Sequence, residues 1–170
     1  METLAAYWAL ARETSAAAFA HLYPCYFLFK HPKGTESATA SASESEFTTR
    51  TSANFDPLPG EFRLIAVKKR AGNPSPDRFT LGRAADCDVV FRFAFISKLH
   101  AILFIQGAKI TILDNKPSNS TFHNHEKLEP GSARSMKLGD TLGLGALELE
   151  LMNAAHLHAL LRARPNGSSS

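Results

Sequence analysis

The amino-acid sequence predicts a mainly β protein: an antiparallel β-sandwich with an N-terminal helix–strand extension and a short C-terminal helix. Two observations predict this fold class. Residues 57–152 are a series of short segments rich in β-branched and aromatic residues, and turn residues separate these segments at frequent intervals. Such a pattern is typical of a sandwich. Helical periodicity of apolar residues is confined to the regions before and after this series.

Residues 1–32 form the first predicted unit. Apolar residues recur at spacings of three and four, which predicts a helix over residues 3–22 that Thr3 can cap and Pro24 ends. The next segment, CYFLFK at 25–30, is aromatic on both faces of a strand, so both faces must be covered. This unit therefore needs a partner surface, either its own sandwich or another chain.

Residues 33–56 are predicted to be a flexible linker. Ten of the eighteen residues from 35 to 52 are Ser or Thr, and Phe47 alone could anchor a core. Such a segment cannot bury enough apolar area to offset the cost of ordering it. Beyond the sandwich, a helix is predicted over 153–164, and a disordered tail over 165–170.

The predicted sandwich spans residues 57–152. Strands are expected at 61–68, 78–83, 87–93, 99–106, 108–114, 136–145 and 147–152. Gly107 indicates a tight hairpin between two of them, and the Gly72-Asn73-Pro74 and Glu129-Pro130-Gly131 runs mark loops.

The charge of the chain is unevenly distributed. Residues 1–59 carry 4 basic and 6 acidic side chains (net −2), whereas residues 60–170 carry 15 and 10 (net +5). A basic C-terminal part favours an anionic partner, but no dense Lys/Arg stripe with interleaved aromatic residues is present, so we expect no nucleic acid. Cys25 and Cys87 are far apart and form no disulfide framework, which indicates two buried, reduced thiols.

The longest apolar run, at 4–11, is too short to span a bilayer, which takes about 20 residues. It could serve as the apolar core of a signal peptide, with the small residues at 18–20 as a cleavage site. Glu2 and the lack of Lys or Arg before the run argue against export. We expect a cytoplasmic protein with no membrane association.

Polar residues gather at four places in the predicted sandwich. These are Gly82-Arg83, then Ser97-Lys98-Leu99-His100, then the run from Asp114 to Asn124 that holds Ser118, Asn119 and Thr121, and finally GDTLGLG at 139–145. The pattern G-R, S-x-x-H, D-x(4)-N-x-T-x-x-N and G-D-x-L-x-L-G resembles a forkhead-associated (FHA) domain. The similarity runs from about residue 61 to residue 152. Four motifs in this order are specific, whereas any one alone would be weak.

The resemblance implies a β-sandwich that binds phosphothreonine peptides through loops at one end. It assigns phosphopeptide binding to Arg83, Ser97, Lys98, Ser118 and Asn119. A guanidinium presents a fork of donors to a phosphate, an ammonium adds a point charge, and hydroxyls add neutral donors. The resemblance assigns loop-structuring roles to Gly82, His100, Thr121 and Asn124.

The sequence departs from the family pattern in the third motif. Ser120 stands where the family usually has Gly, and would be strained if the turn needs a left-handed residue. Asn115-Lys116-Pro117 replace the usual Leu-Gly-Ser after the aspartate, and His125 replaces the Gly that often follows the last asparagine. Arg83 could also be an ordinary surface arginine that pairs with an acidic neighbour, either Asp86 or Asp88.

Other candidate sites are weaker. The pairs His123/His125 and His156/His158 have the spacing of metal ligands, but neither has an evident third ligand, so no metal site is expected. The glycine-rich GDTLGLG run precedes a strand rather than a helix, which argues against a dinucleotide site. No Ser–His–Asp or paired-carboxylate arrangement suggests catalysis, so we expect neither an enzyme nor a cofactor.

Two functional hypotheses follow. The first is a phosphothreonine-dependent adaptor in Ser/Thr kinase signalling, whose partner is a phosphothreonine-containing protein or peptide such as a kinase or its substrate. The second is a phosphate-independent scaffold or dimerisation protein with a degenerate cleft, in which the N-terminal helix and strand supply the interface. The oligomeric state is left open. Threonines of the linker could also be phosphorylated and engage the cleft.

Overall fold

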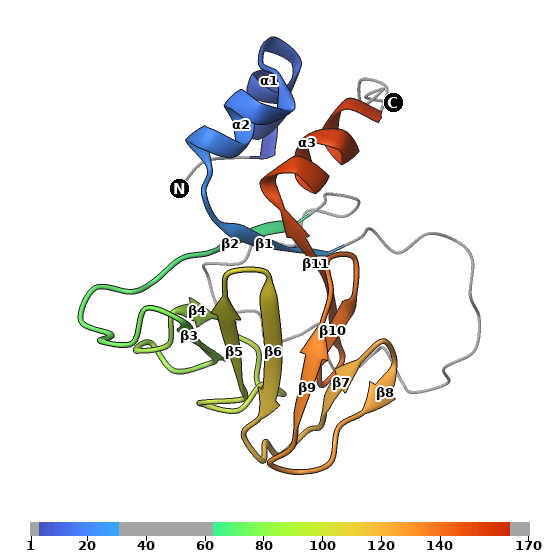
Figure 1. Cartoon of the computed structure of the whole chain (residues 1–170). Coiled ribbons are helices and arrows are strands. Elements are labelled where there is room, and N and C mark those ends of the chain that lie inside the picture. Colours follow the sequence, from blue (N-terminus) through green and yellow to red (C-terminus); the bar gives the residue numbers. More distant parts are fainter. Residues whose placement is uncertain (1–3, 31–62, 164–170) are drawn as a thin grey trace.

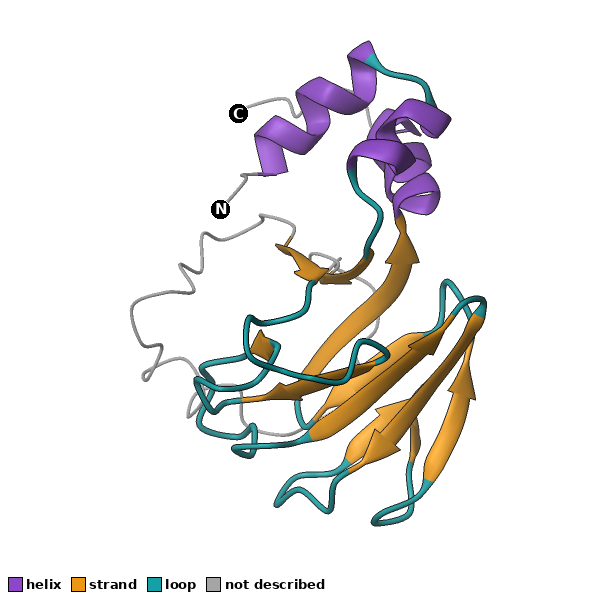
Figure 2. Ribbon diagram, turned by 60° about the vertical axis from the view of Figure 1, so that its left-hand side comes forward, coloured by secondary structure: helices purple, strands orange, loops and turns teal. Residues whose placement is uncertain are grey.

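A computed structural model, which describes residues 4–30 and 63–163, shows two β-sheets packed face to face with three helices gathered beyond one end (Figures 1 and 2). The predicted fold class, a mainly β sandwich flanked by helices, is confirmed. The linker predicted at 33–56, the cap at Thr3 and the tail at 165–170 lie outside the described residues.

The first sheet has the strand order β2-β1-β11-β10-β7-β8, and all its neighbours are antiparallel. Its strands are β1 (Tyr26–Lys30), β2 (Arg63–Val67), β7 (Thr121–His123), β8 (Glu126–Lys127), β10 (Thr141–Leu144) and β11 (Leu147–Asn153).

The second sheet has the strand order β4-β3-β5-β6-β9. Its strands are β3 (Arg78–Gly82), β4 (Val89–Val90), β5 (Ala101–Gln106), β6 (Lys109–Asp114) and β9 (Ala133–Met136). The β3–β4 pair is parallel, and the other pairs are antiparallel.

Two of the expected strand segments differ from the structure, and two strands form where none was expected. The segment expected at 87–93 forms a strand only at β4, since the chain turns away after two residues. The segment expected at 136–145 is divided between the end of β9 and β10, because Gly139 turns the chain with a φ of 89°. The short strands β7 and β8 lie in a stretch for which no strand was expected.

The interior of the sandwich is one apolar core. Fully buried side chains from both sheets and from the β4–β5 connection fill it: Leu28, Leu81, Phe91, Ile96, Leu103, Ile112, Leu142, Leu144 and Leu151. Each such side chain contributes about 1.5–3 kcal/mol through its removal from water, so this core is the main source of stability.

The helix expected at 3–22 is two helices, α1 (Leu4–Glu13) and α2 (Ala16–Leu22). Ser15 breaks the run because its backbone is extended and its Oγ accepts a hydrogen bond from the N–H of Ala18, at 3.2 Å, as an N-cap. The C-terminal helix α3 (Ala154–Ala163) forms within the region predicted for it. The described residues contain no helix that is long and apolar enough to cross a membrane.

Strand β1 has both of its faces covered, as its aromatic sequence predicted. Leu28 lies in the sandwich core, whereas Phe27 and Phe29 lie in a second apolar cluster beneath the helices. Figure 1 shows the three helices on the far side of β1 from the second sheet. The surface that covers this strand therefore belongs to the same chain.

Two long-range hydrogen bonds hold the helices together. The indole N–H of Trp8 donates to the carbonyl of Leu161 at 2.7 Å, and Nε2 of His158 is 3.0 Å from the carbonyl of Thr14. Both cysteines are free thiols, but only Cys87 is buried and Cys25 is half-buried, so the expected burial is correct for one of them.

The buried carboxylate of Asp88 joins strand β3 to the loop between β2 and β3. The Asp88 side chain is fully buried and accepts hydrogen bonds from Nζ of Lys69 (3.1 Å), Nδ2 of Asn73 (2.8 Å), the N–H of Arg70 (2.8 Å), and both the N–H and the hydroxyl of Thr80 (2.9 and 3.0 Å). Burial by itself would raise the pKa of Asp88. The hydrogen bonds outweigh this and hold the pKa well below its ordinary value.

We predict that Asp88→Asn lowers the free energy of unfolding by about 2–4 kcal/mol at neutral pH, because an amide cannot accept from all of these donors. The stabilisation by Asp88 is present above the ordinary pKa of 3.8 and is lost as the pH falls below it, since the unfolded chain then binds the proton more readily. Urea unfolding at a series of pH values measures both effects. Asp86→Asn, at an exposed position two residues away, is the control and should change little.

Candidate functional site

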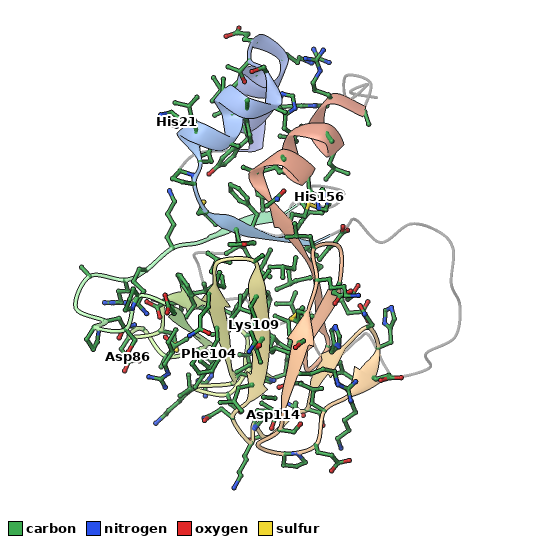
Figure 3. The ribbon with its side chains drawn as sticks, viewed as in Figure 1. His21, Asp86, Phe104, Lys109, Asp114 and His156 are labelled. Atoms are coloured by element: carbon green, nitrogen blue, oxygen red, sulfur yellow. The ribbon has the colours of Figure 1, made fainter. Side chains whose placement is uncertain are left out.

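Three loops meet at the end of the sandwich opposite the helices. They are the β3–β4 loop (83–88), the β4–β5 loop (91–100) and the β6–β7 loop (115–120). Figure 3 marks this end by Asp114, at the foot of β6, and the opposite end of the same strand by Lys109. All the predicted phosphopeptide-binding residues lie on these loops.

Arg83 follows directly after β3 and is fixed to the β4–β5 loop. Its N–H donates to the carbonyl of Ser97 at 2.9 Å, and its side-chain Nε donates to the carbonyl of Ile96 at 3.0 Å. The two terminal nitrogens of the exposed guanidinium have no partner among the described residues. Arg83 pairs with neither Asp86 nor Asp88, so it is not the ordinary paired surface arginine considered above.

Gly82 allows this close approach of the loops. A Cβ at this position would lie 2.2 Å from the carbonyl oxygen of Lys98, a distance that real Cβ atoms essentially never show. Backbone hydrogen bonds lie on both sides of this contact. The N–H of Ala84 donates to the carbonyl of Lys98 (3.0 Å), and the N–H of Phe91 donates to the carbonyl of Gly82 (2.8 Å). The glycine is thus needed for space.

Ser97 connects the second loop to the third. Its Oγ accepts a hydrogen bond from the N–H of Ser118 at 3.0 Å, and its own N–H donates to Nδ1 of His100 at 3.2 Å. The Ser97 hydroxyl proton remains available as a donor. Hydrogen bonds therefore bring Arg83, Ser97 and Ser118 together.

His100 is fully buried beneath the Ser97 loop. Because Nδ1 accepts a hydrogen bond, the ring must carry its proton on Nε2, which has no hydrogen-bond partner among the described residues. Burial lowers the pKa of His100. The backbone of Ser120 and the carboxylate of Asp114 favour the protonated ring, but they offset the effect of burial only in part. A neutral ring with an accepting Nδ1 is what the loop requires.

Lys98 and Asn119 are exposed at the same end. The Lys98 ammonium has no partner among the described residues, while its carbonyl accepts from the thiol of Cys87 at 3.2 Å. Nδ2 of Asn119 donates to the carbonyl of Phe95 at 2.8 Å, so this amide joins the second and third loops and keeps its oxygen available.

Ser120 is not in the left-handed region, so the replacement of the usual glycine carries no backbone strain. The left-handed residue in this loop is instead Lys116, with a φ of 52°. Its N–H donates to Oδ2 of the buried Asp114 at 2.9 Å, and the N–H of Gly131 donates to the same oxygen at 3.0 Å. Asp114 thereby fixes the start of the loop. No role was predicted for Asp114, although an Asp just before a loop is a common local acceptor.

The remaining loop-structuring residues lie next to the binding loops. Oδ1 of Asn124 accepts from the N–H of Thr141 at 2.8 Å and its Nδ2 donates to Asp140 at 3.1 Å, which ties the β7–β8 turn to β10. Thr121 is fully buried, and its hydroxyl has no hydrogen-bond partner in the part of the chain described.

The two histidines of the β7–β8 hairpin are each paired with a different carboxylate. Nε2 of His123 lies 2.7 Å from Asp140, and Nδ1 of His125 lies 3.0 Å from Glu148. Within residues 4–30 and 63–163, no three His, Cys, Asp or Glu side chains are grouped so that they could hold a metal ion.

Comparison with known proteins supports the resemblance found in the sequence. The family model of the FHA domain matches residues 79–145, which confirms the resemblance over that range. No curated protein matches the chain.

Solved structures with a similar arrangement include three proteins. EmbR of Mycobacterium tuberculosis, in complex with a low-affinity phosphopeptide, is 27% identical with a TM-score of 0.42, over 45% of this chain and 20% of that one. The FHA domain of the CT664 protein of Chlamydia trachomatis is 16% identical with a TM-score of 0.47, over 75% and 96%. The N-terminal FHA domain of Rad53p from S. cerevisiae, in complex with a phosphothreonine peptide, is 18% identical with a TM-score of 0.44, over 58% and 90%. The chain thus spans about a fifth of the length of EmbR.

We predict that Gly82→Ala destabilises the protein by about 3 kcal/mol or more, because the new methyl group must displace the backbone of Lys98. Gly139→Ala is the control: its added Cβ meets nothing within 4 Å, and its φ of 89° costs only about 1 kcal/mol of backbone strain. Urea unfolding of the two variants measures the difference. Equal destabilisation by both would show that the Gly82 contact can relax at little cost.

Proposed function

Since the FHA family model matches residues 79–145, we propose that this protein is a phosphothreonine-peptide-binding adaptor. One observation carries the proposal: inter-loop hydrogen bonds join the backbone of Arg83 to Ser97, and Ser97 to Ser118. The terminal guanidinium N–H groups of Arg83 and the hydroxyl protons of the two serines have no acceptor among the described residues. A group of free donors with no carboxylate bound to it suits an anionic ligand.

The donors match a phosphate in number and charge. A phosphothreonine carries about −1.5 to −2 charges at pH 7 and three strong acceptor oxygens. The Arg83 guanidinium would supply two parallel N–H donors, the Ser97 and Ser118 hydroxyls neutral donors, and the Lys98 ammonium the second positive charge. Asn119 would bind the backbone of the peptide through its free oxygen.

Four further residues would act by positioning the binding loops. Gly82 permits the close approach of Lys98, and neutral His100 accepts from the Ser97 N–H. Asn124 joins two loops, and Thr121 fills a buried place at the end of the third loop. None of these four would need to touch the ligand.

We propose a role in binding rather than in catalysis. The adaptor would read the product of a Ser/Thr kinase in the cytoplasm, and its partner would be the kinase or a modified substrate. The proposed segments of the chain are 1–32, 33–56, 57–152, 153–164 and 165–170, and the first and third of them share one sheet through β1.

The alternative of a phosphate-independent scaffold would have to use the helices rather than β1 as its interface. The aromatic strand β1 is enclosed by β2, β11, the sandwich core and the helices, so it has no free apolar face to offer. We predict that the full-length chain is a monomer in light scattering. A stable dimer that forms without phosphopeptide would favour the scaffold.

We predict that Arg83→Ala weakens the binding of a phosphothreonine peptide about 10- to 100-fold, because a charge-assisted hydrogen bond contributes about 1.5–3 kcal/mol. Calorimetric titration of the full-length protein measures this loss. Arg78→Ala is the matched control, since Arg78 is an exposed arginine at the other end of the same strand. It should bind as the unaltered protein does.

Two further titrations complete this test. The unphosphorylated peptide should not bind, because it lacks the dianion that the donors match. If the folded protein binds no member of a phosphothreonine peptide library, or if Arg83→Ala binds as tightly as Arg78→Ala, the proposed function is wrong.

A further inference from the structure

We propose that the binding end selects phosphothreonine peptides that carry additional acidic side chains; this inference rests on the proposed function. The three loops bear more unpaired positive charge than one phosphate requires. Four exposed cations lie on them: Arg83, Arg92, Lys98 and Lys116. No side chain of these four makes an ion pair with a described residue.

The acidic residues of the same loops do not neutralise these cations. The Asp88 carboxylate is buried and bound by Lys69 and by backbone and side-chain N–H groups on the far side of β3. Asp114, at the foot of β6, is likewise buried and bound by two N–H groups. Within the three loops this leaves Asp86 as the one exposed carboxylate.

The charges of ligand and loops do not balance with a phosphate alone. A phosphothreonine brings about −1.5 to −2 charges, which the Arg83 guanidinium and the Lys98 ammonium already match. Arg92 and Lys116 remain, and among the described residues neither forms an ion pair with Asp86 or with Glu129 of the adjoining β8–β9 loop, which are exposed carboxylates at this end. A peptide with carboxylates near its phosphothreonine would supply the missing negative charge, and complementary charge increases both specificity and the rate of association.

Lys116 is held in place by the fold. Its left-handed backbone is fixed by the Asp114 carboxylate, and Pro117 restricts the chain that follows. The methylene groups of its side chain lie over Gly131, where an added Cβ would be 3.1 Å from Cε of Lys116. Because the stem packs on the loop before β9, the ammonium lies beside Gly131 and is free for a ligand group other than the phosphate.

Arg92 lies on a different loop. Its neighbour Phe91 is fully buried and donates its N–H to the carbonyl of Gly82 at 2.8 Å, which places Arg92 near the base of the Arg83 loop. The two spare cations thus belong to the β4–β5 and β6–β7 loops, which are joined by the contact between Ser97 and Ser118. Acidic residues at more than one position of the peptide could therefore meet a cation.

The experiment compares phosphothreonine peptides of equal length in fluorescence anisotropy. One peptide has Gln at all flanking positions, a series has a single Glu placed at each position in turn, and a last one has Lys at the same positions. We expect a single Glu to tighten binding severalfold at one or more positions before or after the phosphothreonine. The Lys peptide should bind more weakly than the Gln peptide. The gain should shrink between about 0.1 M and about 1 M NaCl, as the screening length falls from about 10 Å to about 3 Å.

Charge-neutralising variants of the full chain test the assignment. Lys116→Gln and Arg92→Gln should reduce the preference for Glu but keep the affinity for the Gln peptide, since neither residue is assigned to the phosphate. Lys109→Gln is the control, because Lys109 is an exposed lysine at the opposite end of β6 (Figure 3) and should leave both affinities unchanged.

The outcomes separate this inference from the proposed function. If the Gln and Glu peptides bind equally, or if the preference for Glu survives in the Lys116→Gln/Arg92→Gln double variant, the acidic selectivity is refuted while phosphopeptide binding stands. If unphosphorylated Glu peptides bind as tightly as phosphorylated ones, the surface binds polyanions in general and the inference is also wrong. Binding of no phosphopeptide at all would contradict the proposed function itself.

Discussion

The binding end depends on the close backbone contact between Gly82 and Lys98. Since Gly82 has no side chain, the end of β3 can lie against the 98–99 peptide, and N–H groups on both sides of the contact then find carbonyl acceptors. This contact positions the backbone of Arg83 relative to the side chain of Ser97. Hydrogen bonds from Ser118 to Ser97 and from Asn119 to Phe95 then join the third loop to the second.

The loops are held mainly by neutral groups, which leaves the charged groups free for a ligand. Main-chain amides, a neutral imidazole, the side chains of Asn115 and Asn119 and a serine hydroxyl join the three loops. The one charged group among these contacts is the Arg83 guanidinium, which uses only its Nε for the loop and keeps its two terminal nitrogens for a ligand. The buried carboxylates of Asp88 and Asp114 accept hydrogen bonds from local groups, and neither forms an ion pair with an exposed cation of the three loops among the described residues. Scaffold and ligand therefore do not compete for the same charges, and the site can be rigid and strongly positive at once.

The sequence predicted the fold class, most strands and the motif residues, because alternation, turn residues and motif order are local signals. The two-residue strands were beyond prediction, since β4 and β8 are defined by their neighbours rather than by any pattern of their own. The break between α1 and α2 depends on Ser15 acting as a cap in the middle of an apolar repeat. Ser120 is not strained, because the left-handed residue of this loop is Lys116. The hydrogen bonds of Asp114 to Lys116 and to Gly131 hold that turn, and the local sequence pattern does not reveal them.

The pairing of β1 with β11 also has a consequence for biosynthesis. Tyr26 is paired in register with Asn153, and among the described strands β2 joins its sheet only through β1. A ribosome must therefore synthesise almost the whole chain before the first sheet can close, and contacts so distant in sequence form slowly. Until then the phenylalanines of β1 lack their cover, so a partly synthesised chain exposes aromatic surface that favours aggregation.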